Sequence, residues 1–521
     1  MSITGLLLRT QLLNYFSANE ILEPESKKRN TAVIVGLGVL TMVLFLCTYN
    51  ILTATTLVQM GEEKLIPAYM VAISSFLILL LTMFRSNGIL FGSKDYDMLS
   101  ALPIKASDII SSKFLFMYLL NLVISFVFMV PGGIVWILNS PLNIPHLLLY
   151  FIAVFFVPLI PMSIAAVIGV LIVVVSSRFK KKTLFSLIFS FVALGMVGYF
   201  GFSSMQSGHE PGNLGSMLAG QISSMYPLSK WFLSNANQHM LISMGSFIII
   251  STITFFIFIK VIGAKYGRIN FFVTSSVQHT VRRKESLKQR SSLQALYQKE
   301  WGRFFSSYMY VLNTGLGVVM LCVFSILLLL ISPEELGEYT GMEDMNRFLG
   351  QYAPIMVSML LSLSNPAASS ISLEGKNIWI LQSSPVSVKT ILNSKLAVNL
   401  TLHGFAYIIA VLSITARIKM EAWQMISLLF VPIAYSLFTI VIGIFLNLRY
   451  PNYEWDNEMM VVKQSIPVIA SSLLCMIAVA VPVMLNWFLA FPLMPTLWVS
   501  SVILLIIAGR LYHKVCTANF F

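Results

Sequence analysis

The chain has 521 residues, of which 57% are hydrophobic and only 11% are charged, and its formal net charge is +13. Soluble domains carry about 25% charged residues, so these few charges cannot cover a soluble globule, and a membrane protein is predicted. The apolar runs are long and continuous, which favours spanning helices over a barrel of short alternating strands.

The first half begins with an amphipathic segment at residues 6–16, which is too short to span and suits a helix lying in the membrane interface. Six spans are predicted after it, at about 31–60, 65–90, 114–138, 146–176, 184–202 and 240–264. A polar element at 92–113 separates the second span from the third. This half is assigned to residues 1–265.

A basic segment at 266–295 is predicted to be a cytoplasmic linker. The second half, 296–521, then repeats the plan of the first. An amphipathic segment at 296–305 precedes six spans, at about 308–332, 350–372, 396–416, 422–447, 465–486 and 489–510. Its polar element, at 374–395, again lies between the second and third spans. The predicted fold is therefore an all-α membrane protein with about twelve spanning helices in two related halves.

The two polar elements match each other without gaps. The pairs at one constant spacing are Lys94 with Lys376, Leu99 with Leu381, Pro103 with Pro385, Ile109 with Ile391, Ser112 with Ser394, and Lys113 with Lys395. Because Pro is tolerated in the first turn of a helix, a short helix is predicted at 103–110 and another at 385–392. Asp108 lies in an early turn of the first, where a negative charge suits the helix dipole.

Basic residues define the expected orientation. With both ends on one side of the membrane, about 29 of the 34 Lys and Arg residues lie on that side, which makes it the cytoplasm. The basic excess is thus explained by orientation and lipid contact, and no nucleic-acid partner is predicted.

Several kinds of active site have no counterpart in this sequence. It contains no G-x-x-x-x-G-K-[ST] loop, no dinucleotide fingerprint, no HExxH and no G-x-S-x-G. No Asp or Glu lies at the centre of a predicted span, where such a group would indicate ion coupling. We therefore predict no catalytic residues, no metal and no bound cofactor. Uncharged polar groups and a proline within spans suit interhelical hydrogen bonds and kinks, or a substrate path: Asn121, Asn365, Pro366 and Asn399.

The sequence resembles the permeases of ABC-2-type exporters, particularly the large fused permeases of Gram-positive bacteria. The resemblance lies in Glu374-Gly375-Lys376, Trp379, Leu381, Pro385-Val386-Ser387 and Lys395, in the Leu99, Leu102-Pro103 and Lys113 counterpart, and in Lys299-Glu300 with Arg303-Phe304. In that family each half has an N-terminal interfacial helix and a cytoplasmic coupling helix between spans two and three.

This resemblance implies a transport subunit, not an enzyme, in a bacterial plasma membrane with both termini cytoplasmic. A separate pair of cytoplasmic ATPase subunits would bind ATP and Mg²⁺ and drive export of a hydrophobic or amphipathic cargo, such as a peptide, a lipid-like compound or a drug. The residues implied in contact with the ATPase are Leu102, Pro103, Ile104, Asp108, Lys113, Trp379, Pro385, Val386, Lys389 and Lys395. Those implied in the interfacial helices are Arg9, Gln11, Lys299, Glu300 and Arg303.

Two alternatives remain open from the sequence. An ion-coupled carrier of six-plus-six topology would be expected to carry buried ionisable groups and a G-x-x-x-D-R-x-G-R-like loop, and neither is seen. A membrane-embedded lipid-processing enzyme would need clustered acidic and His residues at the membrane edge. Glu454, Asp456 and Glu458 come nearest, but they lack a His and suit a solvated loop.

Overall fold

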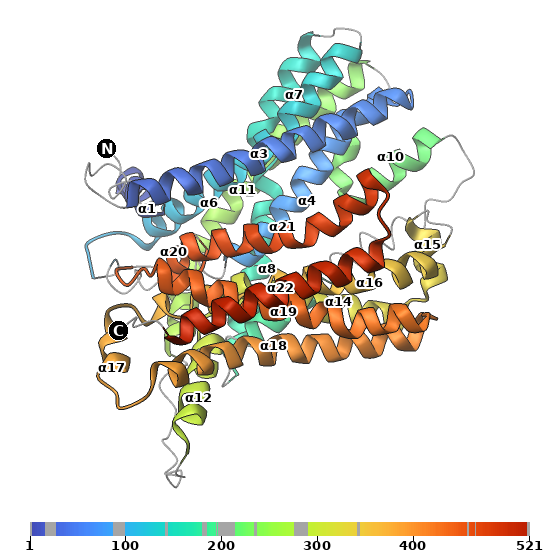
Figure 1. The fold of residues 1–521 in the computed structure, drawn as a ribbon. Coiled ribbons are helices and arrows are strands. Elements are labelled where there is room, and N and C mark those ends of the chain that lie inside the picture. Colours follow the sequence, from blue (N-terminus) through green and yellow to red (C-terminus); the bar gives the residue numbers. More distant parts are fainter. Residues whose placement is uncertain are drawn as a thin grey trace. The chain divides into compact units, whose positions relative to one another are not determined.

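The computed structural model describes residues 3–15, 28–86, 99, 101–140, 144–179, 185–193, 195, 214–233, 237–275, 290–340, 344–455, 458–463 and 465–517. Within these residues every regular element is a helix (Figure 1). The chain divides into two compact units, unit 1 (Met1–Arg283) and unit 2 (Lys284–Phe521).

Unit 1 contains seven helices of more than twelve residues in its described part. They are α1 (Ile3–Tyr15), α3 (Lys28–Gln59), α4 (Ile66–Ser86), α6 (Ala106–Asn139), α7 (Ile144–Phe156), α8 (Leu159–Ser176) and α11 (Asn237–Ser275). The shorter elements are η1 (Glu63–Leu65), α10 (Leu214–Met225) and η3 (Pro227–Phe232). Helix α4 lies at the centre, packed against α6 and α8, while α1 and α3 pack against α6.

Unit 2 begins with α12 (Ser292–Ser306), whose start is fixed by a capping box of Ser291 and Gln294. The elements that follow are α13 (Tyr308–Thr314), α14 (Leu316–Leu330), α15 (Pro333–Thr340), α16 (Met345–Ser362), η4 (Pro366–Ala368), η5 (Ser372–Asn377), α17 (Ile378–Gln382), α18 (Val388–Arg417), α19 (Ala422–Arg449), α20 (Glu458–Val462), α21 (Ile466–Leu489) and α22 (Leu493–Thr517). Helix α19 is central and packs against α16, α18, α21 and α22; α18, α19 and α22 run side by side in Figure 1.

The two units share one packing plan. The short first helix lies on the third long helix in both, α1 on α6 and α12 on α18. The central pair is α4 with α8 in unit 1 and α16 with α19 in unit 2, and the last long helix, α11 or α22, packs on the second member of that pair. These shared contacts suit the predicted repeat, which stays a prediction.

The described residues contain the long apolar helices that a multi-pass membrane protein requires. Nine of their helices are long and apolar enough to cross a membrane, or ten if the bent pair α13 and α14 is one span. That pair bends by 65° at Gly315, where a Cβ would lie 2.7 Å from the Val311 carbonyl oxygen. Exposed Leu, Ile, Val and Phe side chains line the outer faces of α11, α21 and α22, which suits contact with lipid.

Three predicted segments differ from the helices of the structure or are only partly described. Nine of the 19 residues of span 184–202 lie outside the described residues, so the count of twelve stays a prediction. The predicted linker at 266–295 overlaps regular helix at both ends, because α11 continues to Ser275 and α12 begins at Ser292. Separate short helices at 103–110 and 385–392 are not formed: residues 106–110 are the first turns of α6, and residues 388–392 are the first turns of α18.

The physical reason for this difference is visible at the start of α18. The Ser387 hydroxyl accepts a hydrogen bond from the Thr390 backbone N–H at 3.3 Å, which makes Ser387 the N-cap. No proline follows it before α18 ends at Arg417, so the helix continues through the whole predicted third span. Pro385 lies in the turn before the cap, as Pro103 lies in the turn before Lys105, the N-cap of α6.

Candidate functional site

The centre of unit 2 contains a break in its second span. Helix α16 ends at Ser362, and the chain continues through the short 3-10 turns η4 and η5. All residues from 364 to 375 are buried although they lie outside any α-helix. Pro366 has no N–H and restricts the residue before it, which explains why the helix does not resume here. Gly375 has φ +57°, a conformation that favours glycine.

Side chains from other elements supply the hydrogen bonds that this irregular backbone lacks. Asn447 Oδ1 on α19 accepts from the backbone N–H groups of Ile371 and Ser372, at 2.8 and 3.1 Å. Trp455 Nε1 donates to the Ser372 carbonyl at 2.8 Å, and the Tyr310 hydroxyl donates to that of Pro366 at 3.1 Å. Non-helical backbone at membrane depth is tolerated only where it is buried in protein or lines a cavity, and here it is buried and hydrogen-bonded.

His403 on α18 belongs to the same set of contacts. Its Nε2 lies 2.7 Å from the Ser364 carbonyl oxygen, and because a carbonyl only accepts, Nε2 carries the proton. Its Nδ1 then accepts from the Ser436 hydroxyl, also at 2.7 Å. The ring is therefore a bridge between the break and α19.

Asn365 is the hydrogen-bonding centre of the break. Its Nδ2 donates to the Thr439 carbonyl at 2.8 Å, and its Oδ1 accepts from Asn399 Nδ2 at 3.2 Å. The side chain fits because residue 443 is glycine: a Cβ there would lie 2.5 Å from Asn365 Nδ2 and Oδ1. The expected kink at Asn365 and Pro366 is thus present as a complete interruption of the helix.

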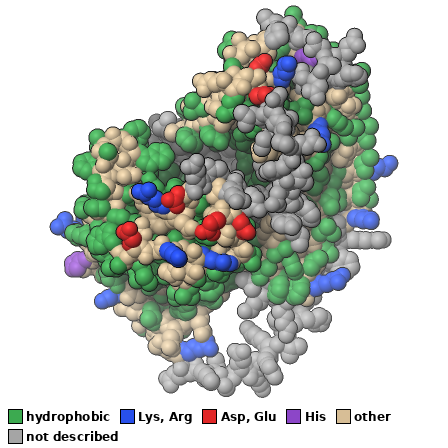
Figure 2. All heavy atoms as spheres, turned by 90° about the vertical axis from the view of Figure 1, so that its right-hand side faces the viewer, with side chains coloured by type: hydrophobic (Ala, Val, Ile, Leu, Met, Phe, Trp, Pro, Cys, Tyr) green, Lys and Arg blue, Asp and Glu red, His purple; other side chains and the backbone are tan. Residues whose placement is uncertain are grey.

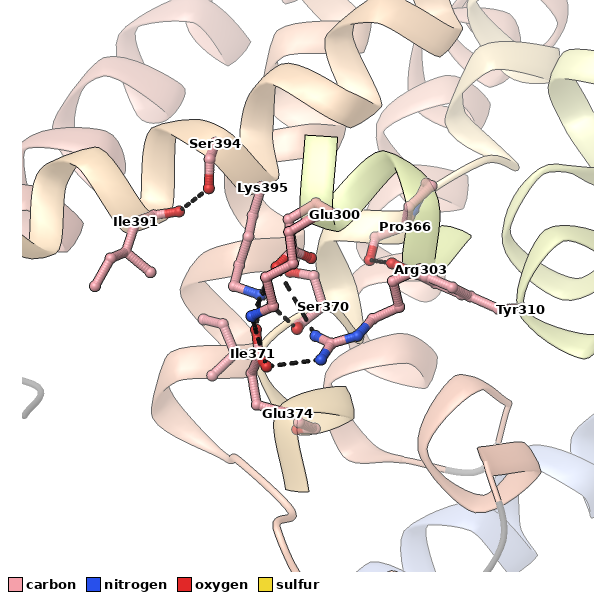
Figure 3. A network of polar contacts seen from close by, with 12 residues as sticks. Glu300, Arg303, Tyr310, Pro366, Ser370, Ile371, Glu374, Ile391, Ser394 and Lys395 are labelled. Atoms are coloured by element: carbon pink, nitrogen blue, oxygen red, sulfur yellow. Dashed lines mark hydrogen bonds and ion pairs between the residues drawn. The ribbon is translucent and has the colours of Figure 1, made fainter. Parts of the chain in front are cut away.

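A buried ion network lies directly after the break (Figure 3). Glu374 of η5 is 4% exposed and faces three cations. Its Oε1 is 2.8 Å from both Lys395 Nζ and Lys299 Nζ, and its Oε2 is 2.8 Å from Arg303 Nη2. Lys299 and Arg303 come from α12 and Lys395 from α18, so the network joins α12 to the two ends of the polar element at 374–395.

Lys395 is the most enclosed member of this network. Its Nζ donates to Glu300 Oε1 at 2.8 Å, to Glu374 Oε1 at 2.8 Å and to the Ser370 carbonyl oxygen at 2.9 Å. An ammonium has three donors, and all three are used. With Lys299 and Arg303, the network holds three positive and two negative groups. Such groups are stable when buried only if they remain paired.

Arg303 connects the network to the surface. Burial by itself would lower the pKa of Arg303, but its hydrogen bond to Glu374 and the charges of Glu374 and Glu300 raise that pKa above its ordinary value. The guanidinium therefore stays charged, and it fixes α12 against the end of the second span.

Unit 1 has a related arrangement among its described residues. Lys113 and Ser112 are buried like Lys395 and Ser394, and each Ser hydroxyl bonds a carbonyl three residues earlier. In the alignment that pairs Lys113 with Lys395, the residue aligned with Glu374 is Gly92. Gly92 lies outside the described residues. On α1, Gln11 Nε2 donates to Ser112 Oγ at 3.4 Å.

In this same alignment Thr82 and Asn121 correspond to Ser364 and His403. Asn121 Nδ2 donates to Thr82 Oγ1 at 2.8 Å, so both units connect the second and third spans at equivalent positions. Unit 2 differs in making this connection through the backbone of a broken helix. Sequence comparison of the two halves did not reveal these contacts, because it was confined to the polar elements.

The residues implied in ATPase contact divide into two groups. Leu102, Pro103, Trp379, Pro385 and Lys389 are exposed, while Ile104, Asp108 and Val386 are partly exposed. Lys113 and Lys395 are each 3% exposed and so offer no surface to another protein, contrary to expectation. Lys395 faces inward because Glu300, Glu374 and the free Ser370 carbonyl lie there.

The residues implied in the interfacial helices also differ in their surroundings. Arg9 is exposed on α1 and Gln11 is partly exposed, whereas Lys299, Glu300 and Arg303 on α12 belong to the ion network. Glu374 was missed as a site residue, although it closes an apolar run and is the only acid in its polar element. Among the described residues, no group of His, Cys, Asp and Glu side chains could hold a metal ion.

A search of protein-family models finds none that matches this chain. A search of curated proteins likewise finds no significant match.

Proposed function

We propose that the chain is the membrane-spanning subunit of an exporter driven by a separate cytoplasmic ATPase. The observation that carries this proposal is the position of α17. Its exposed Trp379 and Ile380 lie between Glu374 and the start of α18. A force applied to α17 would therefore act directly on a segment fixed by ion pairs to α12 and α18.

Two further features support the proposal. Several helix contacts have counterparts in both units, as expected of a transporter built from related halves. The polar elements and entry helix resemble those of ABC-2-type permeases, and the sequence contains no phosphate-binding loop of its own. In this proposal residues 376–387 face the cytoplasm, which the distribution of Lys and Arg favours. ATP and Mg²⁺ are bound by the partner.

Cargo is proposed from the chemistry of the spans. Their exposed faces are apolar, and the buried polar groups around the break of unit 2 are mostly uncharged amides and hydroxyls. Such a bundle suits a hydrophobic or amphipathic cargo.

The test is co-purification of the tagged full chain with an ATPase encoded beside it, followed by ATP-dependent transport in proteoliposomes. We expect Trp379→Ala to reduce ATPase retention at least about fivefold without lowering the amount of permease in the membrane. Trp487→Ala is the matched control, because Trp487 is also exposed (73%) but lies on α21.

Equal retention by the two variants would refute the role of α17. Transport by the purified chain alone on an ion gradient would favour a carrier instead, and conversion of a lipid substrate would favour an enzyme.

A further inference from the structure

The surroundings of the Lys395 ammonium have the composition of a cation-binding site. Two carboxylate oxygens and one backbone carbonyl oxygen lie at 2.8, 2.8 and 2.9 Å from Nζ. The carbonyl is that of Ser370, which is available because the helix is broken at this point. Broken helices supply carbonyl ligands to cations in membrane transporters in the same way.

The ligands come from separate elements, and two of them have partners other than Lys395. Glu300 lies on α12, and Glu374 has Lys299 and Arg303 as further partners. Ser370 belongs to a segment fixed by Asn447 through Ile371 and Ser372. The Glu374 and Ser370 oxygens should therefore keep their positions when the lysine side chain is shortened, and Glu300 remains next to them on α12.

We propose that Glu300, Glu374 and the Ser370 carbonyl form a binding site for a primary ammonium ion, in which the Lys395 side chain is the resident, covalently attached ligand. A primary ammonium fits because it supplies three N–H donors to three oxygens. The other charged groups facing the site are Lys299, 3.7 Å from Glu300 Oε1, and Arg303, 3.8 Å from it. Both are cations, and neither reaches Glu300 at hydrogen-bond distance.

This assignment is independent of the proposed function, since it concerns binding and not transport. It also has a consequence for energy coupling. A cation that is part of the chain cannot leave the site, so no ion gradient can be discharged through it.

The experiment uses the full chain in detergent with Lys395→Ala, which keeps Cβ and removes three carbons and the ammonium. n-Propylammonium replaces the deleted atoms. We expect the variant to unfold on the order of 10 °C below wild type, because one partner of a buried ion pair is missing. Added n-propylammonium should restore at least half of this loss in a saturable manner, as followed by tryptophan fluorescence.

Three controls separate binding from general effects. Tetramethylammonium at equal ionic strength has no N–H donor and should restore nothing. Wild type should not respond to n-propylammonium. Lys389→Ala, which removes an exposed cation from the same helix, should be unaffected as well. Equal recovery with both ammonium ions, or no recovery with either, would overturn the proposal.

A second variant covers the case in which Lys395→Ala does not fold. Glu300→Gln combined with Lys395→Ala leaves Glu374 paired with Lys299 and Arg303 and removes the unpaired acid. This double variant should fold without added amine and show no response to it. If it is as unstable as the single variant, Lys395 acts by packing alone and the ammonium site is refuted.

Discussion

Glu374→Gln tests the ion network most directly, because it removes one negative charge at almost constant volume. In wild type, Glu374 Oε1 accepts from Lys395 and Lys299, and Oε2 accepts from Lys299 and Arg303. A Gln side chain has one acceptor oxygen, and its NH₂ group must then face a cationic donor on the other side.

The expected loss of unfolding free energy follows from how deeply Glu374 and its cationic partners are buried. Glu374 and Lys395 are both nearly completely buried, while the side chains of Lys299 and Arg303 are 38% and 26% exposed and can be partly solvated. Removing one partner of a buried ion pair destabilises a protein by about 3–5 kcal/mol. Because water can partly solvate Lys299 and Arg303 once Glu374 is neutral, we expect a loss at the lower end of this range, about 3 kcal/mol. That is a large fraction of the roughly 5–15 kcal/mol that stabilises a typical domain.

The assay is urea unfolding of the full chain in detergent micelles, followed by tryptophan fluorescence. Glu454→Gln is the control, because it neutralises an exposed acid of unit 2 outside the ion network; it should change the unfolding free energy by less than about 0.5 kcal/mol. If Glu374→Gln also stays within that range, the network contributes no net stability and the reasoning from its geometry is wrong.

Two further substitutions test the broken segment. Gly443→Ala should destabilise by about 1–3 kcal/mol because its Cβ would displace the Asn365 amide. The control is Gly404→Ala on α18, which has nothing within 4 Å of its Cβ position and should be neutral or slightly stabilising. Thermal unfolding should show a lower melting temperature for Gly443→Ala alone, and equal shifts for both variants would contradict the close approach of Asn365 to Gly443. Asn447→Leu should cost about 3 kcal/mol or more, since it leaves two buried N–H groups unpaired. Asn447→Asp keeps the accepting oxygen and should lose less. Faster trypsin cleavage at Lys376 in Asn447→Leu alone would confirm that the Asn447 oxygen holds the broken segment. Identical cleavage of both variants would refute that role.

Sequence periodicity and composition predicted the long elements because lipid contact imposes a simple rule on them. The expected span at 422–447 lies within α19. The expected span at 489–510 overlaps α22, which begins four residues later than predicted, at Leu493, and continues to Thr517. The predicted span at 350–372 was different. Its composition is that of a buried helix, and hydropathy cannot tell buried helix from buried irregular backbone. The Asn365-Pro366 pair was the local signal for the break.

The ion network was only partly predictable for a different reason. Lys299, Glu300, Arg303 and Lys395 were all selected, but as members of separate motifs. Their meeting with Glu374 depends on the packing of α12 against α18, which no local pattern specifies. Lys395 was predicted to lie at a surface that contacts the partner, because lysine is usually exposed. The structure buries it, because Glu300, Glu374 and the Ser370 carbonyl accept its three hydrogen bonds.

The break after α16 also restricts where unit 2 can move. Its backbone is held by Asn447, His403, Tyr310 and Trp455, which come from four other segments. A shift of the break against α19 or α18 would leave several buried polar groups unpaired at once, each at a cost of about 1–3 kcal/mol. We therefore expect α12, the break, α17 and the first turns of α18 to move as one body. Disulfide cross-links placed within this body should leave the proposed transport activity unchanged, whereas loss of that activity on cross-linking α12 to α18 would show that the body itself must open.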